Sequence, residues 1–236
     1  MAGTLADPIT VMKRHELKYL LDAGKTEYLK QRLVGHMHPD GFGLTTIASL
    51  YYDTPDRRLI RASLERPEFK EKLRLRSYGP ATESSPVFLE LKCKAGDLVY
   101  KRRVQSTLGA AEAFFDGADA LGPGQIEGEL AAFRELYEPL EPACLILYDR
   151  IAYCESGGEL RLTIDAAPRY RMEGLTLAGA ADGIPLLPEG WTILELKVQD
   201  AIPLWMARIL SEGQIYKNSF SKYGEAYRRE TLGTAV

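Results

Sequence analysis

Two short stretches decide the fold: residues 71–76, EKLRLR, and residues 89–94, LELKCK. In each stretch a charged residue alternates with an apolar one. This is the pattern of a β-strand that buries one face and presents the other to solvent or to a polar ligand. The pattern recurs along the chain, and the charged faces are mostly basic although the chain as a whole carries a formal charge of -3. The central question is therefore whether these basic faces point to solvent or toward a ligand.

The composition limits the classes of function. The chain has 236 residues, of which 45% are hydrophobic and 27% are charged, as in an ordinary globular domain. The sequence pI of about 5.8 argues against a general nucleic-acid binder. Three cysteines without CxxC spacing predict neither a disulfide framework nor a zinc site. Since no apolar run approaches the roughly 18 residues of a membrane span, we expect a cytoplasmic protein without direct membrane insertion.

Periodicity and turn residues predict alternating groups of strands and helices. We expect a single domain over residues 1–236, in which residues 1–10 form a loose tail. Asp200 is predicted to cap the helix that begins at residue 202, and the DTPD segment at 53–56 is predicted to form a turn rather than a metal pair. The predicted strands are 11–20, 48–52, 69–78, 87–94, 98–106, 146–154, 159–166 and 191–199, and the predicted helices are 25–35, 108–115, 126–137, 202–212 and 223–230.

The charged faces of these strands hold twelve basic and four acidic side chains, a local excess of eight positive charges. The remainder of the chain must then carry -11. Like charges that lie opposite each other in a sheet repel, so a solvated outer face explains a single strand but not the whole set. The residues are Arg14, Glu16, Lys18, Lys72, Arg74, Arg76, Glu90, Lys92, Lys94, Lys101, Arg103, Arg150, Arg161, Asp165, Glu195 and Lys197.

An antiparallel sheet that closes on itself would turn all these charges inward. We therefore predict an α+β fold: a closed antiparallel β-barrel of about eight strands, with a charged interior that forms a tunnel and with helices packed outside. Arginine suits bidentate phosphate contacts and lysine supplies a movable point charge. The few carboxylates suit Mg²⁺ or Mn²⁺, which prefer oxygen ligands.

Nine ordered segments resemble the VTC domain, the polyphosphate polymerase domain of the CYTH-like, triphosphate tunnel metalloenzyme superfamily. Together they span nearly the whole chain, whereas one such motif alone would carry little weight. They are RHELKY at 14–19, LYYDTP at 50–55, KLRLRSYG at 72–79, LELKCK at 89–94, YKRR at 100–103, YDRIAY at 148–153, LRLTID at 160–165, LELKV at 194–198 and SFSKY at 219–223.

The resemblance implies a role for individual residues. It implies that ATP, triphosphate or polyphosphate binds in the tunnel, that Tyr148 and Ser221 hydrogen-bond the substrate, and that Glu195, with Glu16 and Glu90, holds Mn²⁺ or Mg²⁺. Arg14 and Lys72 join the set because they lie on the charged faces. The residues that grip phosphates by this resemblance are Lys18, Arg74, Arg76, Lys92, Lys101, Arg150, Lys197 and Lys222, with Arg103 and Arg161 as companions.

Three functions remain open at this point. The resemblance implies transfer of the γ-phosphoryl group of ATP onto a growing polyphosphate chain. The same tunnel could instead hydrolyse inorganic triphosphate or a nucleoside triphosphate, with water in place of the acceptor. A third hypothesis is a non-catalytic domain that binds polyphosphate or inositol phosphates. No nucleic-acid partner is expected, since aromatic side chains suited to stacking are sparse among the basic residues.

Overall fold

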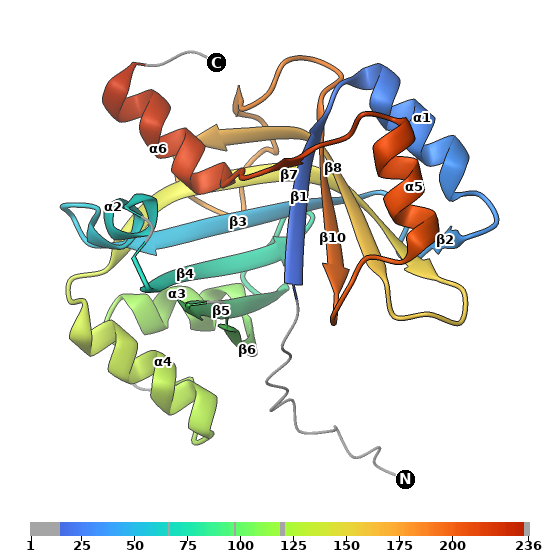
Figure 1. Cartoon of the computed structure of the whole chain (residues 1–236). Helices are drawn as coiled ribbons and strands as arrows, with labels where there is room; N and C mark the ends of the chain where they lie inside the picture. The colour runs from blue at the N-terminus through green and yellow to red at the C-terminus, as the bar shows by residue number, and fades with distance from the viewer. Residues whose placement is uncertain (1–14, 66, 97, 119–120, 234–236) are drawn as a thin grey trace, which may run out of the picture.

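A computed structural model describes residues 15–65, 67–96, 98–118 and 121–233 (Figure 1). The predicted tail at 1–10, and with it Arg14, lies outside these residues. The helices are α1 (Ala23–Leu33), α2 (Arg58–Leu64), α3 (Leu108–Phe115), α4 (Gln125–Leu136), α5 (Leu204–Glu212) and α6 (Lys222–Leu232). The strands are β1 (His15–Leu21), β2 (Met37–Pro39), β3 (Thr45–Asp53), β4 (Phe69–Tyr78), β5 (Pro86–Ala95), β6 (Leu98–Thr107), β7 (Glu141–Glu155), β8 (Arg161–Arg171), β9 (Ile184–Pro185), β10 (Thr192–Val198) and β11 (Lys217–Asn218).

The strands form one antiparallel sheet in the order β11-β1-β10-β8-β7-β3-β4-β5-β6, with β2 added to β7 and β9 added to β8. The long strand β7 pairs with β3 and with β8, and the register shifts in both pairings, between Tyr51 and Tyr52 and between Leu147 and Asp149. Such irregularities bend a sheet and increase its twist. In Figure 1, β1 and β10 accordingly run steeply across the direction of β3, β4 and β5.

The predicted closure of the barrel is wrong. Strands β6 and β11 stand at the two ends of the hydrogen-bonded order, and no backbone pairing among the described residues joins them. Side chains bridge this side instead: Lys92 of β5 contacts Glu16 of β1 at 2.8 Å. The sheet is therefore strongly curved but open, because a side-chain contact stands where a closed barrel would have a ladder of backbone hydrogen bonds.

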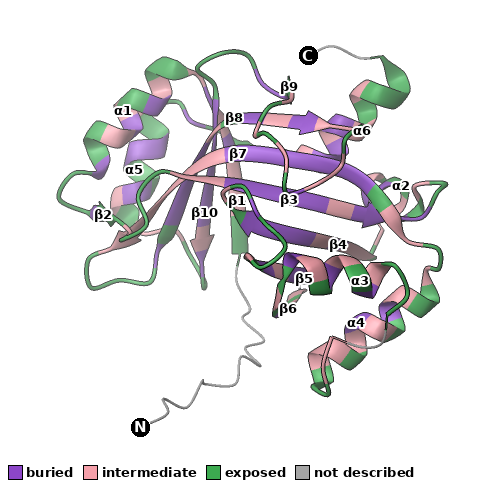
Figure 2. Ribbon diagram, turned by 180° about the vertical axis from the view of Figure 1, so that it is seen from behind, coloured by how far each residue is buried: buried purple, intermediate pink, exposed green. Residues whose placement is uncertain are grey.

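The apolar strand faces are buried under helices, as the alternation predicts. One core cluster joins β3–β6 to α3 and α4 and includes Leu73, Leu75 and Leu89. A second joins β1, β8 and β10 to α1 and α5. Figure 2 shows buried stretches in β3, β4 and β7, and β3 is buried along most of its length. Burial of apolar side chains on this scale is the main favourable contribution to folding.

Two helices depart from the prediction that helices pack only outside. A third core cluster places Ile60 of α2 and Ala226 of α6 against Tyr148 and Ile47, which lie on the inner, concave face of the sheet. The α2 segment and the short strands β2, β9 and β11 were not predicted. The predicted cap is also wrong, because α5 begins at Leu204 after Pro203, without a side-chain cap, rather than after Asp200.

The DTPD segment is a structural turn, as predicted. The carboxylate of Asp53 is fully buried and accepts hydrogen bonds from the backbone N–H groups of Thr54, Leu59 and Ile60. It also accepts one from the hydroxyl of Tyr223 at 2.9 Å, so it ties β3, α2 and α6 together.

Replacing this carboxylate should destabilise the fold. In Asp53→Ala, the buried donors lose their acceptor, which we expect to lower the free energy of unfolding by about 2–4 kcal/mol. Asp56→Ala, an exposed change in the same turn, should lower it much less. Urea titration of both variants measures the difference, and equal losses would contradict the role of Asp53.

Candidate functional site: a basic cluster on the inner face

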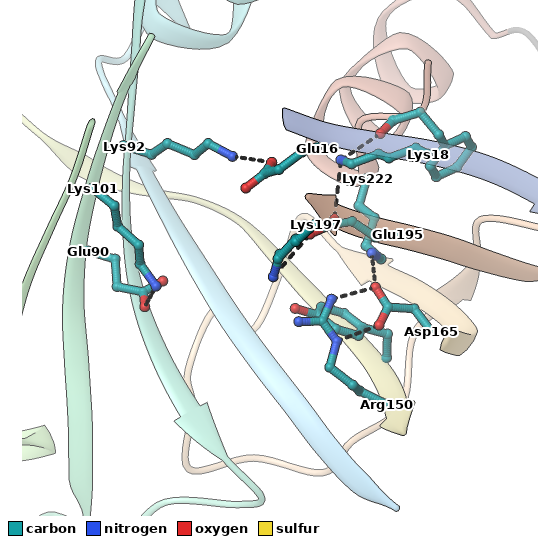
Figure 3. A network of polar contacts seen from close by, with 12 residues as sticks. Glu16, Lys18, Glu90, Lys92, Lys101, Arg150, Asp165, Glu195, Lys197 and Lys222 are labelled. Atoms are coloured by element: carbon teal, nitrogen blue, oxygen red, sulfur yellow. Dashed lines mark hydrogen bonds and ion pairs between the residues drawn. The ribbon is translucent and has the colours of Figure 1, made fainter. Parts of the chain in front are cut away.

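The charged strand faces meet on the inner face of the sheet, where the first turn of α6 joins them. Residues of β5 and β6 face those of β1, β10 and α6 across this region (Figure 3). Ten basic side chains face four carboxylates there, an excess of six positive charges. We call this set the basic cluster: Lys18, Lys72, Arg74, Arg76, Lys92, Lys101, Arg103, Arg150, Lys197 and Lys222, with Glu16, Glu90, Asp165 and Glu195.

Backbone register forces lysines side by side in this cluster. Lys72 of β4 is paired with Lys92 of β5, which is paired in turn with Lys101 of β6. Like charges directly opposite each other in a sheet are destabilising. Glu16 and Glu90 offset the charges of Lys92 and Lys101, whereas Lys72 contacts no carboxylate in the described chain, so an anion over this row would relieve the remaining repulsion.

Glu90 offsets the next row of charges. Its carboxylate is 1% exposed and contacts Arg74 at 2.6 Å, Lys101 at 2.6 Å, Arg103 at 3.5 Å and Arg76 at 3.6 Å. Burial alone would raise the pKa of Glu90, but Arg74, Arg76 and Lys101 together hold it well below its ordinary value. Glu90 thus stays ionised and fixes the positions of four cations.

Asp165 has the equivalent position on the other side of the cluster. It is fully buried, accepts two hydrogen bonds from Arg150 at 2.6 and 2.8 Å, and lies 2.5 Å from the ammonium of Lys222. Burial would raise its pKa, and Lys222 and Arg150 outweigh burial and lower it. The bidentate contact sets the direction of the Arg150 guanidinium.

Glu195 and Glu16 lie on neighbouring strands and are less completely engaged by cations. Glu195 contacts Lys197 at 3.2 Å and Lys18 at 3.9 Å, and Glu16 contacts Lys92. Burial would raise the pKa of Glu195, and Lys197 and Lys18 hold it well below its ordinary value. Two ionised carboxylates of this kind fit Mg²⁺ or Mn²⁺ when substrate phosphate oxygens complete the coordination.

The three predicted metal ligands do not meet in one group. Within residues 15–65, 67–96, 98–118 and 121–233, no set of three or more His, Cys, Asp or Glu side chains lies close enough to hold a metal ion. Glu90 faces four cations instead, so its contacts fit a structural role better than metal ligation. Glu195 and Glu16 therefore remain the candidate metal ligands.

Lys72 has only a neutral partner among the contacts within the described chain, since its ammonium donates to Ser221 Oγ at 3.1 Å. Burial lowers the pKa of Lys72 to about 8, and neighbouring Lys18 and Lys92 act in the same direction although Tyr51 opposes them. Lys18 donates to the backbone oxygen of Phe220 at 3.1 Å. The segment before α6 thus supplies neutral acceptors to two lysines of the cluster.

A family model for the VTC domain matches residues 13–230. The chain belongs to the VTC domain family. This confirms the resemblance drawn from the nine segments, and it places the basic cluster within the matched region. No curated protein matches the chain significantly.

The fold of this VTC domain is similar to those of solved structures with low sequence identity. A putative adenylate cyclase from Bacillus halodurans is 15% identical with a TM-score of 0.56, over 89% of this chain and 96% of the other. A putative adenylate cyclase from Vibrio parahaemolyticus is 14% identical with a TM-score of 0.47, over 91% and 97% of the two chains.

None of the helices in the described part of the VTC domain has the length and apolar character needed to span a bilayer.

Some residues of the site were not predicted. Arg74 donates to the hydroxyl of Tyr51 at 3.1 Å, and Arg76 donates to Ser49 and to Tyr148. Burial would raise the pKa of Tyr51, but Arg74, Lys72 and Arg76 lower it below its ordinary value. The strand that carries Tyr51 and Ser49 alternates no charges, so the pattern that revealed the other strands gave no signal there.

Of the predicted substrate-binding residues, Arg161 lies apart from the cluster. Arg14 is outside the described residues. Arg161 is exposed at the start of β8, where it shares the inner face with Thr163 and Asp165 but takes part in none of the described ion pairs. Thr163, buried beside Glu195 in the β8–β10 register, has no hydrogen-bond partner for its hydroxyl among the described residues.

Anion binding should depend on pH through Lys72. Above pH 8 its amine loses the proton, so the affinity for inorganic triphosphate should fall as the pH rises from 7 to 9. Lys72→Arg keeps a charged guanidinium and should show a smaller fall over this range. Calorimetric titration of both proteins tests this, and the titration of the ligand itself cancels in the comparison. Identical pH profiles would show that Lys72 does not contact the anion.

Proposed function

We propose that this VTC domain is a metal-dependent polyphosphate polymerase that transfers the γ-phosphoryl group of ATP onto a growing polyphosphate chain. The observation that carries the proposal is the row of Lys72, Lys92 and Lys101 within a cluster that has an excess of six positive charges. A chain of phosphates matches both the excess charge and its extended arrangement across three strands. Membership of the VTC domain family supports the same reaction.

The basic cluster would hold the two reactants in line. Arg74 and Arg76, fixed by Glu90, present guanidinium groups that suit bidentate phosphate contacts. Lys222 and Arg150, fixed by Asp165, approach from the opposite side. In phosphoryl transfer, most of the catalysis comes from positioning the two reactants and from stabilising the negative charge on the transferred group.

The transfer itself needs no protein base. An ionised oxygen on the terminal phosphate of the acceptor attacks the γ-phosphorus of ATP. The bond from that phosphorus to the oxygen bridging it to the β-phosphate breaks, and ADP leaves with the electron pair. Glu195 and Glu16 would hold Mn²⁺ or Mg²⁺, which would supply positive charge to the phosphate oxygens.

Hydrolysis of triphosphate or of a nucleoside triphosphate is the second candidate. The open side of the sheet favours this reaction. Lys92 and Glu16 bridge that side, and the Lys92 side chain is 39% exposed, so water has access there. Water that entered there could replace the acceptor at the same phosphorus atom.

The products separate these candidates. We expect the purified protein, incubated with ATP and Mn²⁺, to release ADP and to form phosphate polymers that electrophoresis resolves by chain length. Free phosphate without polymer would establish a triphosphatase. Triphosphate binding without turnover would leave a binding domain and overturn both proposed reactions.

Removing one carboxylate should separate turnover from binding. Glu195→Gln removes a negative charge from the proposed metal site while the basic cluster remains. Substitution of a residue that only orients a metal ligand costs about 10–100-fold in metal affinity or activity. Glu195 is proposed as a ligand itself, so we expect at least about a 100-fold loss of turnover. Triphosphate binding measured without metal should persist. The matched control is Glu212→Gln, an exposed glutamate on α5. Full turnover in Glu195→Gln would exclude Glu195 as an essential ligand.

A further inference from the structure

An aromatic pair lies at one end of the basic cluster. Tyr78, the last residue of β4, packs edge-on against Phe88 of β5, with ring centroids 5.7 Å apart. The guanidinium of Arg103 lies 3.6 Å from the centroid of the Phe88 ring. It also donates a hydrogen bond to the hydroxyl of Tyr78 at 3.2 Å. We call these three residues the ring cluster.

Arg103 connects the ring cluster to the phosphate-binding residues. Its guanidinium lies 3.5 Å from the carboxylate of Glu90, the group that fixes Arg74. Because residues i, i+2 and i+4 of a strand share a face, Tyr78 lies on the same face as Arg74 and Arg76. Four residues at about 3.4 Å each separate Tyr78 from Arg74 by roughly 14 Å. This distance is comparable to the span of an extended nucleoside triphosphate.

The Tyr78 ring is the accessible part of this cluster. Tyr78 is 49% exposed, whereas Tyr148, deeper on the same inner face, is buried. Its hydroxyl is held by Arg103, so the orientation of the ring is fixed without a covering side chain. A single exposed aromatic residue is ordinary on a protein surface. Tyr78 differs because Arg103, which donates a hydrogen bond to its hydroxyl, also contacts Glu90 in the basic cluster.

We propose that Tyr78, supported by Arg103, is the subsite for the base of a nucleoside triphosphate whose phosphates lie over Arg74 and Arg76. An exposed ring offers a stacking surface for any nucleobase, and Arg103 adds a planar cation beside it. The subsite therefore binds nucleotides without selecting one base. This inference rests on the proposed function, since it concerns the donor nucleotide of that reaction.

Comparing two ligands isolates the contribution of the base. We would measure the affinities of ATP and of inorganic triphosphate for the wild-type protein, Tyr78→Ala and Tyr78→Phe by calorimetric titration with Mn²⁺. Tyr78→Ala should weaken ATP binding by about tenfold or more, in line with the loss of one stacking contact. Its triphosphate affinity should stay within about twofold, because the basic cluster is intact. Tyr78→Phe should bind ATP nearly as well as the wild type. Tyr216→Ala, which removes an exposed ring elsewhere, is the matched control.

Three outcomes would overturn the subsite. Unchanged ATP affinity in Tyr78→Ala would show that the base does not stack there. An equal loss for both ligands would mean that Tyr78 only supports Arg103. A wild-type protein that bound neither ligand would overturn the subsite and the proposed function together. A selective loss of ATP binding in a protein that formed no polymer would leave the subsite standing and reject the polymerase alone.

Discussion

Crowding of positive charge on one curved face is the constraint on which the rest of this structure depends. Three lysines share one cross-strand row, and the two most deeply buried carboxylates of the basic cluster, Glu90 and Asp165, are surrounded by cations. Such an arrangement costs folding free energy unless the carboxylates stay ionised, and the cations lower their pKa values accordingly. The remaining excess of charge suits a polyanion, which links the cost in the free protein to the proposed substrate.

The curvature of the sheet converts separate strand faces into one site. Register shifts in the pairings of β7 let the sheet bend, so that β1 and β10 come to face β4 and β5. Helix α6 then brings Lys222 to Asp165, and the residue before it brings Ser221 to Lys72. Buried Asp53 holds that helix through Tyr223. The turn at Asp53 thus helps to position α6, and with it the contact of Lys222 with Asp165 and that of Ser221 with Lys72, although the turn lies far from α6 in the sequence.

The roles proposed for the four carboxylates follow from how closely cations already contact each of them. Glu90 and Asp165 orient guanidinium groups, while Glu195 and Glu16 retain fewer contacts and suit a divalent ion. Arg103 lies between the buried carboxylate and the exposed ring of Tyr78, where phosphate recognition would pass into base stacking. Under this proposal, one inner face would accommodate the whole length of a nucleotide.

Alternation of charged and apolar residues was enough to locate most strands, because a half-buried strand requires it. It located β4 with its observed bounds and showed which residues share a face, while a helical pattern located α3 with its observed bounds. Whether the sheet closes, where α2 and α6 pack, and that Glu90 faces four cations were decided only by the tertiary structure. These features depend on contacts between residues far apart in the chain, such as Lys92 with Glu16, for which local periodicity carries no information.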